Sequence, residues 1–251
     1  MRPPDRDEQA NDVTIGVPLR ALAVIPARGG SKRIPRKNIR HFCGKPMIHW
    51  SIDAALRSGC FERVIVSTDD PEIASLAREA GAEVPFQRPA ELSDDHATTS
   101  AVVVHAATWA QSAGMRPEAI CCIYATAPFI RTKDISEGLA LLHSGNWEFV
   151  FSATQFEAPV QRAFRLADDR RTTMLFPENF NVRSQDLRPI FHDAAQFYWG
   201  RPGAWLSGTP IFQSRSTVIE IPRWRSQDID SPEDWDQAER LASTMLARSM
   251  S

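Results

Sequence analysis

The residues best suited to chemistry lie in one basic loop between positions 28 and 38. Small residues let backbone N–H groups approach a ligand closely, and arginine and lysine donate to negative oxygens. Such a loop fits a triphosphate, although dense basic charge alone more often marks a solvated surface loop. The loop combines five basic residues with two glycines and a serine: Arg28, Gly29, Gly30, Ser31, Lys32, Arg33, Arg36 and Lys37.

The position of this basic loop favours the phosphate interpretation. It directly follows the apolar run Leu22–Ile25, which predicts a buried strand. The loop contains neither a Walker A pattern nor the glycine pattern that opens a dinucleotide-binding helix. It therefore belongs to neither of those two classes of phosphate-binding motif.

A second candidate is the acidic pair Asp228 and Asp230. Side chains two residues apart in an extended segment point to the same side, so both carboxylates could meet one Mg²⁺ ion and its phosphate ligands. The alternative is that the two acids only complement the dipole of a following helix. However, Ser231 already supplies the N-cap of that helix, with Pro232 at its first position, which leaves the acidic pair free.

A third candidate is the segment Arg88–Leu92, followed by Asp94–Thr99. Exposed loop backbone, an arginine and hydroxyl side chains can provide the donors and acceptors that the edge of a base requires. The alternative, equally favoured by the spacing, is that Arg88 only pairs with Glu91 or Asp94.

Composition restricts the class of protein. A chain of 251 residues suits one large domain, and a net charge of −2 with a pI near 6.3 argues against a nucleic-acid partner. No apolar run approaches the ~20 residues of a membrane span. The four cysteines lack metal-binding spacing, which predicts reduced thiols in a cytoplasmic protein. We expect residues 1–18 to be a disordered extension and residues 19–251 to form a single domain.

Strand and helix patterns alternate along the chain. Apolar runs predict strands at 22–27, 63–67, 83–86, 120–125, 149–153, 195–199 and 218–221. Helical spacing and capping residues predict helices at 45–58, 70–81, 98–113, 132–144 and 231–247. The alternation predicts an α/β fold with a mainly parallel, twisted sheet flanked by helices, which binds its ligand beyond the carboxyl ends of the strands. Between 156 and 188 the regularity fails, and two short apolar triplets around an Asp-Asp-Arg-Arg turn predict a hairpin.

Taken together, the basic loop, the Arg88–Leu92 segment and the acidic pair resemble the nonulosonic acid cytidylyltransferases, which activate sialic-acid-like sugars. The resemblance covers the chain from about Leu19 to Leu246. It implies a Rossmann-like fold of the nucleotide-diphospho-sugar transferase type. It also implies a homodimer, with a dimerisation arm within residues 156–190.

The resemblance also implies roles for particular residues. Mg²⁺ would be held by Asp228 and Asp230, which would act in catalysis together with Arg28 and Lys37. CTP would be bound by nine residues of the basic loop and of the Arg88–Thr99 region: Arg28, Gly29, Ser31, Lys32, Lys37, Asn38, Arg88, Ala97 and Thr99.

Two later segments of the sequence, around Tyr124 and His192, indicate which sugar the protein uses. Members that use sialic acid typically have glutamine where this chain has Tyr124, and Arg-Pro-Asn-Gly where it has His192–Ala195. The patterns present here resemble the pseudaminic acid branch instead, although a lone histidine is more often structural. Arg183 could pair with the carboxylate of the sugar. The expected sugar-binding residues are Tyr124, Thr126, Arg183, Gln185, His192, Asp193 and Gln196.

The expected reaction is transfer of CMP from CTP to the anomeric hydroxyl of a nonulosonic acid, with pseudaminic acid preferred and pyrophosphate released. Alternatives with the same fold use N-acetylneuraminic, legionaminic or 3-deoxy-manno-octulosonic acid. A non-catalytic nucleotide-binding regulator is the alternative from a different class, but it would need no metal-binding carboxylates. A polyanion-binding protein is disfavoured by the near-neutral net charge.

Overall fold

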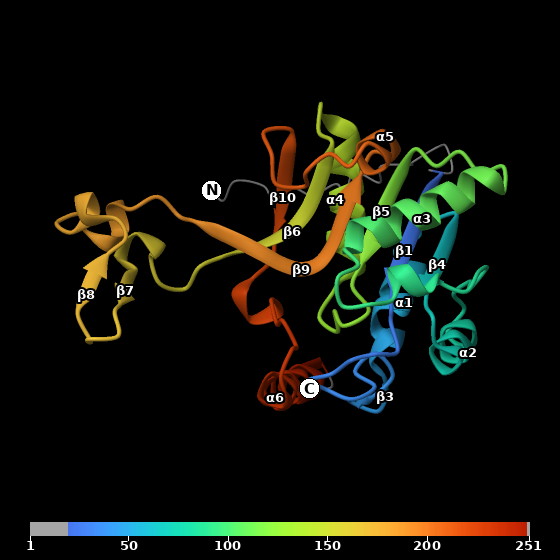
Figure 1. The fold of residues 1–251 in the computed structure, drawn as a ribbon, viewed down its shortest axis with the longest axis horizontal. Helices are drawn as coiled ribbons and strands as arrows, with labels where there is room; N and C mark the ends of the chain where they lie inside the picture. The colour runs from blue at the N-terminus through green and yellow to red at the C-terminus, as the bar shows by residue number, and fades with distance from the viewer. Residues whose placement is uncertain (1–19, 250–251) are drawn as a thin grey trace, which may run out of the picture.

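The computed structural model describes residues 20–249, so the predicted extension at 1–18 lies outside the described residues. Its centre is a six-stranded sheet with the order β10-β6-β9-β5-β1-β4 (Figure 1). Strand β9 is antiparallel to both of its neighbours, and the other three neighbouring pairs are parallel. The strands are β1 Ala21–Pro26, β4 Arg63–Ser67, β5 Ala119–Ile123, β6 Phe149–Gln155, β9 Phe191–Gly200 and β10 Ser216–Glu220.

Helices cover both faces of this sheet. Successive residues of its central strands point to opposite faces, and they pack into two separate apolar clusters, one on each face. Helices α1 (Met47–Arg57), α2 (Pro71–Glu79) and α4 (Thr132–Ser144) pack on one face. Helices α3 (Thr99–Ser112) and α5 (Pro202–Leu206) pack on the other. The mainly parallel α/β fold predicted from the alternation is therefore confirmed.

Helix α2 shows why these local predictions succeed. The Asp70 carboxylate accepts hydrogen bonds from the N–H groups of Glu72 and Ile73, at 2.9 and 3.0 Å, and thereby caps the helix. Gly81 follows the last turn with φ +90°, a conformation that favours glycine after a helix. The predicted N-cap and the predicted C-terminal glycine of this helix are both confirmed.

The C-terminal helix α6 (Pro232–Ser249) packs beneath the basic loop rather than against the sheet. Its start is fixed by reciprocal hydrogen bonds between Ser231 and Asp234, the arrangement of a capping box. Trp235 is fully buried against Ile34 of the basic loop and Phe42 of a short hairpin. That hairpin consists of β2 (His41–Phe42) and β3 (Lys45–Pro46). Helix α6 thereby supports the basic loop from below.

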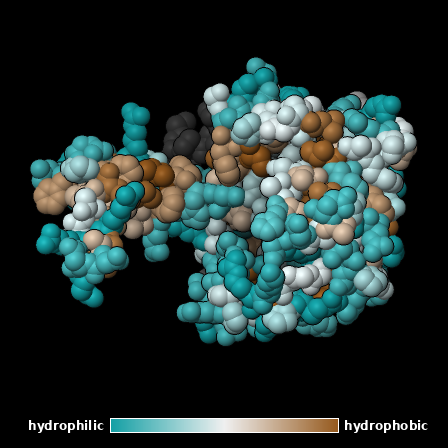
Figure 2. Space-filling view, viewed as in Figure 1, coloured by the Kyte–Doolittle hydropathy of each residue, from teal (hydrophilic) through white to brown (hydrophobic). Residues whose placement is uncertain are grey.

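Residues 156–190 form an arm that projects from the body (Figure 1). It contains the predicted hairpin, as strands β7 (Phe164–Leu166) and β8 (Thr172–Met174), together with short 3₁₀ turns at 160–162, 177–179 and 184–186. Strand β9 returns from the arm into the sheet. Apolar side chains gather on the arm surface in Figure 2.

Three details of the predicted elements need correction. The strand expected at 83–86 is a single bridge between Glu83 and Ile65, since Pro85 has no N–H to extend the pairing. Helix α1 begins at Met47, because the preceding Lys45–Pro46 pairs as β3. Strand β9 begins at Phe191, earlier than expected, because it continues from the arm along β6. In the described part of the chain, none of the helices has the length and apolar character to cross a membrane.

Candidate active site

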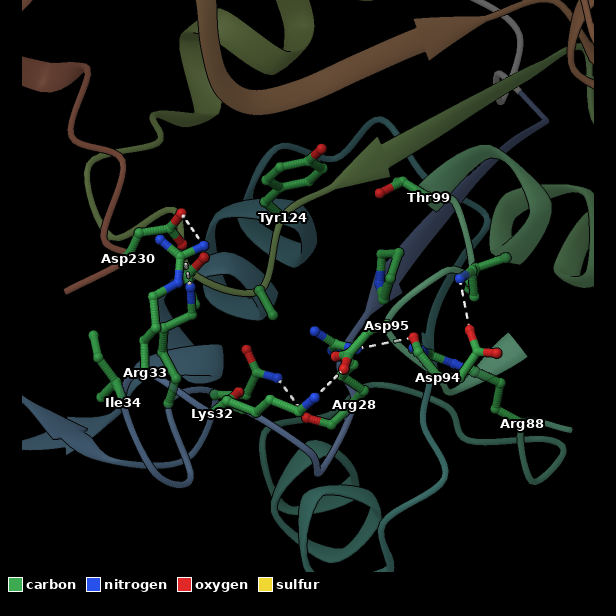
Figure 3. Close-up of a pocket in the computed structure, with 18 of the residues that line it drawn as sticks. Arg28, Lys32, Arg33, Ile34, Arg88, Asp94, Asp95, Thr99, Tyr124 and Asp230 are labelled. Atoms are coloured by element: carbon green, nitrogen blue, oxygen red, sulfur yellow. Dashed lines mark hydrogen bonds and ion pairs between the residues drawn. The ribbon is translucent and has the colours of Figure 1, made fainter. Parts of the chain in front are cut away.

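The carboxyl ends of β1, β4, β5 and β10 meet at one edge of the sheet, where loops enclose a cavity of about 510 Å³ (Figure 3). Eleven of the predicted site residues line it: Arg28, Ser31, Lys32, Lys37, Asn38, Arg88, Ala97, Thr99, Tyr124, Thr126 and Asp230. The structure thus brings the basic loop, the Arg88–Thr99 region and one member of the acidic pair to the same place.

The basic loop is held from behind by polar contacts. The Gly29 N–H donates to Asp69 at 3.1 Å, and the Asn38 side-chain amide donates to the Arg28 carbonyl at 2.9 Å. A Cβ atom on Gly29 would lie 2.6 Å from the carboxylate of Asp70, so only glycine fits this close approach. Arg36, with φ +57°, pairs with the same Asp70. Gly29 therefore shapes the loop without lining the cavity, and Asn38 holds the Arg28 backbone in place.

Two cations of the loop contact an acid that the sequence analysis did not single out. Asp95 accepts from the Arg28 guanidinium at 2.8 Å and also pairs with Lys32 (Figure 3). The Lys32 ammonium, followed by the Arg28 guanidinium, lowers the pKa of the Asp95 carboxyl. Because carboxylate and phosphate oxygens use the same donors, Asp95 occupies a position that a phosphate group could take.

The acidic pair faces the other cations of the loop. Asp230 contacts the Lys37 ammonium at 3.1 Å and the Arg33 guanidinium at 3.0 Å, and Lys37 also donates to the Ile229 carbonyl at 2.7 Å. Ile229 is buried while Asp228 is exposed, the alternation expected of an extended segment. Partial enclosure of the Asp228 carboxyl, and then the negative charge of Asp230, raise its pKa.

The donor set of this acidic pair fits Mg²⁺. Both side chains offer only oxygen ligands, and Asp228 forms no ion pair with another described residue, whereas Asp230 is paired with Lys37 and Arg33. Among residues 20–249, no three His, Cys, Asp or Glu side chains come together as a complete metal cage. Mg²⁺ needs no such cage, because it takes one or two carboxylates and completes its shell with water and phosphate oxygens.

Arg88 is almost fully buried, with 5% of its surface exposed, at the wall of the cavity. Its Nε donates to the Ser67 hydroxyl at 3.1 Å and one terminal nitrogen donates to the Ser67 carbonyl. Burial lowers the pKa of Arg88 to about 10. The guanidinium is thus fixed by the end of β4, and not by Glu91 or Asp94, the partners of the alternative interpretation.

The start of α3 supplies the neighbouring wall. The Asp94 carboxylate accepts from the backbone N–H groups of His96 and Ala97, at 2.9 and 2.7 Å, which fixes a tight turn. Thr98 caps α3, and Thr99 lines the cavity as the first residue of the helix. The Ala97 N–H is therefore already bonded to Asp94. A backbone contact between Ala97 and a ligand would have to use the carbonyl of Ala97.

The predicted sugar-binding residues are not all brought together. Tyr124 and Thr126 line the cavity after β5. Asp193 and Gln196 lie behind it, where Asp193 accepts from the Ala195 N–H at 2.8 Å and from the Tyr198 hydroxyl, and Gln196 is 3% exposed. The remaining three lie outside this cavity, on the arm or at its base: Arg183, Gln185 and His192.

The positions of Arg183, Gln185 and His192 explain why these three residues lie outside the cavity. His192 is exposed near the base of the arm, with its ring 4.6 Å from that of Phe156. Arg183 is 73% exposed on the arm and pairs with Asp186 at 2.8 Å, and the neighbouring Gln185 is also exposed. Within one chain, the arm therefore carries these predicted sugar ligands away from the cavity.

The structure adds three charged residues to the cavity that the sequence analysis left out of the site: Arg33, Asp94 and Asp95. All three lie inside segments already singled out, so their neighbours were the available signal. Outside the cavity lining, Arg225 is buried and paired with Asp134. Its partner is 91 positions away in the sequence, so no local pattern could reveal the pair.

A mainly parallel sheet with helices on both faces, and a cation-lined cavity at its carboxyl edge, defines a nucleotidyltransferase-type protein. The solved structure of a CMP-2-keto-3-deoxy-manno-octonic acid synthetase in complex with CTP has the same fold, with a TM-score of 0.67 at 18% identity over 90% of this chain and 99% of that one. The fold is also shared by a 4-diphosphocytidyl-2C-methyl-D-erythritol synthase from Anaerococcus prevotii, with a TM-score of 0.60 at 12% identity over 89% of this chain and 98% of that one.

The sequence profile of the cytidylyltransferase family matches residues 22–248, and the chain belongs to this family. It is 44% identical to the pseudaminic acid cytidylyltransferase of Campylobacter jejuni over 89% of this chain and 96% of that protein. It is 30% identical to the CMP-N,N'-diacetyllegionaminic acid synthase of Legionella pneumophila, with the same two shares covered.

Proposed function

We propose that this chain transfers CMP from CTP to the anomeric hydroxyl of a nonulosonic acid, and that the acid is pseudaminic acid. The anomeric hydroxyl gives up its proton to solvent, its oxygen forms a bond to the α-phosphorus, the bond from that phosphorus to the bridging oxygen breaks, and pyrophosphate leaves. The observation that carries the proposal is the cavity lined by cations in a member of the cytidylyltransferase family. The 44% identity to a pseudaminic acid cytidylyltransferase supports the choice of sugar.

Positioning and charge neutralisation supply most of the catalysis in such a transfer. Arg28, Lys32, Arg33 and Lys37 lie around the cavity and would bind the phosphate oxygens, with Ser31 as a further donor. In the structure these four cations are paired with Asp95 and Asp230. Nucleotide binding would therefore exchange carboxylate partners for phosphate partners.

Mg²⁺ is proposed as the metal, held by Asp228 and Asp230. When bound, the ion neutralises phosphate charge and can lower the pKa of an oxygen that it contacts. Asp230 would exchange part of its contact with Lys37 and Arg33 for the metal, which frees these two cations for the leaving pyrophosphate. Arg88, fixed by Ser67, would contact the cytosine together with the exposed backbone at Ala97 and the Thr99 hydroxyl.

The sugar proposal depends on the far wall of the cavity. Tyr124 presents a bulky ring there, and burial raises the pKa of its hydroxyl, which stays protonated and can donate a hydrogen bond. Its ring centre lies 5.4 Å from that of Tyr198, whose hydroxyl donates to Asp193. A sugar with a second acylamino group would find an apolar surface and a hydroxyl donor at this wall.

We further propose that the chain is a homodimer held by the arm. Several large apolar side chains of the arm are exposed, and Phe164, Leu166 and Phe180 each have 60–63% of their surface accessible (Figure 2). Burial of such side chains is the usual driving force for association. Since Arg183 and Gln185 are also on the arm, their predicted sugar contacts would be made in the second copy.

The proposed location is the cytoplasm. All four cysteines are free thiols, and three of them are buried in the body. Free thiols are the expected state in a reducing compartment.

Pyrophosphate release from CTP and Mg²⁺ tests the proposed function. The substrates are pseudaminic, legionaminic, N-acetylneuraminic and 3-deoxy-manno-octulosonic acids, with the CMP-sugar identified by mass. Turnover with pseudaminic acid alone is the expected result. Turnover with another acid would keep the reaction but replace the sugar, and CTP binding without any turnover would favour the regulator.

A further inference from the structure

Arg225 and Asp134 form a buried ion pair outside the cavity lining. The two side chains are only 5% and 9% exposed. Both terminal nitrogens of Arg225 donate to the Asp134 carboxylate, and the longer contact, from Nη2 to Oδ1, measures 3.3 Å. This two-point geometry fixes direction as well as distance, because the guanidinium and the carboxylate are both planar.

Stability alone gives a weak reason for this pair. Removing two charges from water is costly, and apolar side chains of similar volume often serve a protein interior equally well. In addition, the Nε of Arg225 is buried without a hydrogen-bond partner among the described residues. A pair that adds little net stability but fixes geometry points to a role in positioning.

The place of Arg225 in the sequence indicates which segment the ion pair positions. It ends the short 3₁₀ turn at 223–225 and lies three residues before Asp228. The stretch from Ser226 to Asp230 belongs to neither a helix nor a strand, so it lacks the support of regular hydrogen bonding. Contacts at its two ends must therefore determine where the two carboxylates lie.

The contacts at the first end reach two separate elements. Asp134 lies in the first turn of α4, shortly after the loop that carries Tyr124 and Thr126 into the cavity. The Arg225 carbonyl accepts from the side-chain amide of Gln196 in β9, at 2.7 Å. Arg225 therefore joins the segment of the acidic pair to α4 through its side chain and to β9 through its backbone.

The other end of the segment is held by apolar packing. Ile229 is 1% exposed and packs in the cluster that contains Ile34 and Trp235. Lys37 binds the Ile229 carbonyl and thereby connects this end to the basic loop. Asp228 lies between the two supports, with no ion-pair partner among the described residues, so its position depends on both of them.

We propose that the Arg225–Asp134 pair is a positioning device, which holds Asp228 and Asp230 opposite the cations of the basic loop. The inference rests on the proposed function, because it assigns to Arg225 and Asp134 the placement of the proposed metal ligands. Neither residue lines the cavity. Loss of the pair displaces the carboxylates and leaves the basic loop and the Arg88 wall intact.

The test replaces both charges at once, with Arg225→Met and Asp134→Leu in the same chain, so that no unpaired charge stays buried. The melting temperature should stay close to that of the wild type. CTP binding without Mg²⁺, measured by calorimetry, should be unchanged. The gain in CTP affinity that Mg²⁺ provides, and kcat, should each fall by about 10-fold to 100-fold, the usual effect of losing support behind metal ligands.

A control is the Arg215–Glu148 pair, which joins the amino ends of β6 and β10, at the sheet edge opposite the cavity, at 2.7 Å. The double substitution Arg215→Met and Glu148→Leu also removes an ion pair, but far from the cavity. It should leave kcat and the effect of Mg²⁺ on CTP affinity unchanged.

The outcomes distinguish a failure of the proposed function from a failure of the positioning role. If the wild type shows no Mg²⁺-dependent turnover, the proposed function fails. If the wild type is active and the folded Arg225→Met, Asp134→Leu variant retains its kcat and its Mg²⁺ effect, the positioning role is overturned. Should that variant not fold, Asp134→Asn takes its place, since it keeps the shape and an acceptor, and full activity there overturns the role equally. Arg225→Lys, which keeps the charge but loses the two-point contact, should fall between the wild type and the double variant.

Discussion

The cavity and the arm are built on opposite principles. In the cavity, polar side chains are anchored by the protein itself: Arg88 is 5% exposed and fixed by Ser67, and Asn38 is 8% exposed and fixed by the Arg28 carbonyl. On the arm, apolar side chains are exposed, and the two strands have only three residues each. The cavity is thus preorganised within one chain, whereas the arm lacks a covering partner in one chain. The two regions should therefore fail independently when mutated.

The largest effect is expected at the acidic pair. Asp230→Ala should lower Mg²⁺-dependent kcat by at least about 10²–10³-fold, the range for removing one electrostatic group at a transition state. Because Asp230 is partly exposed, its loss should leave the fold and the arm intact. Pyrophosphate release, with circular dichroism and light scattering, measures this. Normal turnover in a folded Asp230→Ala variant would remove the metal assignment.

The next effect concerns the arm. Phe164→Asp combined with Phe180→Asp should dissociate the proposed dimer, because each truncated anchor of an interface costs about 2 kcal/mol or more, roughly 30-fold in the dissociation constant. Light scattering should show the mass of a single chain, while CTP binding to the cavity stays unchanged. The matched control is Phe212→Asp, which also replaces an exposed phenylalanine but lies on the body. An unchanged mass in the arm variant would contradict the arm as the interface.

A smaller effect is expected for Arg88→Lys. Lysine cannot reproduce the contacts of the guanidinium with both the hydroxyl and the carbonyl of Ser67. The KM for CTP should rise by about tenfold, which corresponds to ~1.4 kcal/mol, with a smaller change in kcat. Discrimination between CTP and UTP should also weaken. A KM that stays the same for both nucleotides would separate Arg88 from base recognition.

The smallest effect is a gain in affinity. Asp95→Asn removes the carboxylate that pairs with Arg28 and Lys32 in the nucleotide-free chain. CTP would then no longer compete with a charged partner, and its affinity should rise by about two-fold to five-fold, because exposed ion pairs are weak and screened by solvent. Calorimetric titration with CTP measures the change, with Glu91→Gln as a nearby control. Weaker binding would show that Asp95 supports the nucleotide site.

How much the sequence predicts depends on the range of the interactions. The basic loop, the Asp70 cap and the acidic pair are short-range patterns, and the sequence predicted where each lies. The apolar pattern at 83–86 predicts a strand, but Pro85 has no N–H to donate, so the pairing there is a single bridge at Glu83. Asp95 was missed because its partners, Arg28 and Lys32, lie more than 60 positions away. Residues whose role depends on distant partners need the fold before they can be recognised.

The sugar residues illustrate the same limit. Tyr124 and Thr126 follow directly after β5, so the rule that ligands bind beyond the carboxyl ends of strands places them correctly in the cavity. Arg183 and Gln185 lie in an irregular stretch, where no periodicity indicates direction. The structure places them on the projecting arm, outside the cavity of their own chain.

The close approach of Gly29 to Asp70 restricts how this protein can change. A side chain at position 29 would force Asp70 to shift, because its Cβ would lie 2.6 Å from that carboxylate. A shift of Asp70 would at the same time disturb the N-cap of α2 and the ion pair with Arg36. The three features are therefore coupled. Efforts to redesign the loop for a different nucleotide should begin elsewhere or alter positions 29, 36 and 70 in a single step.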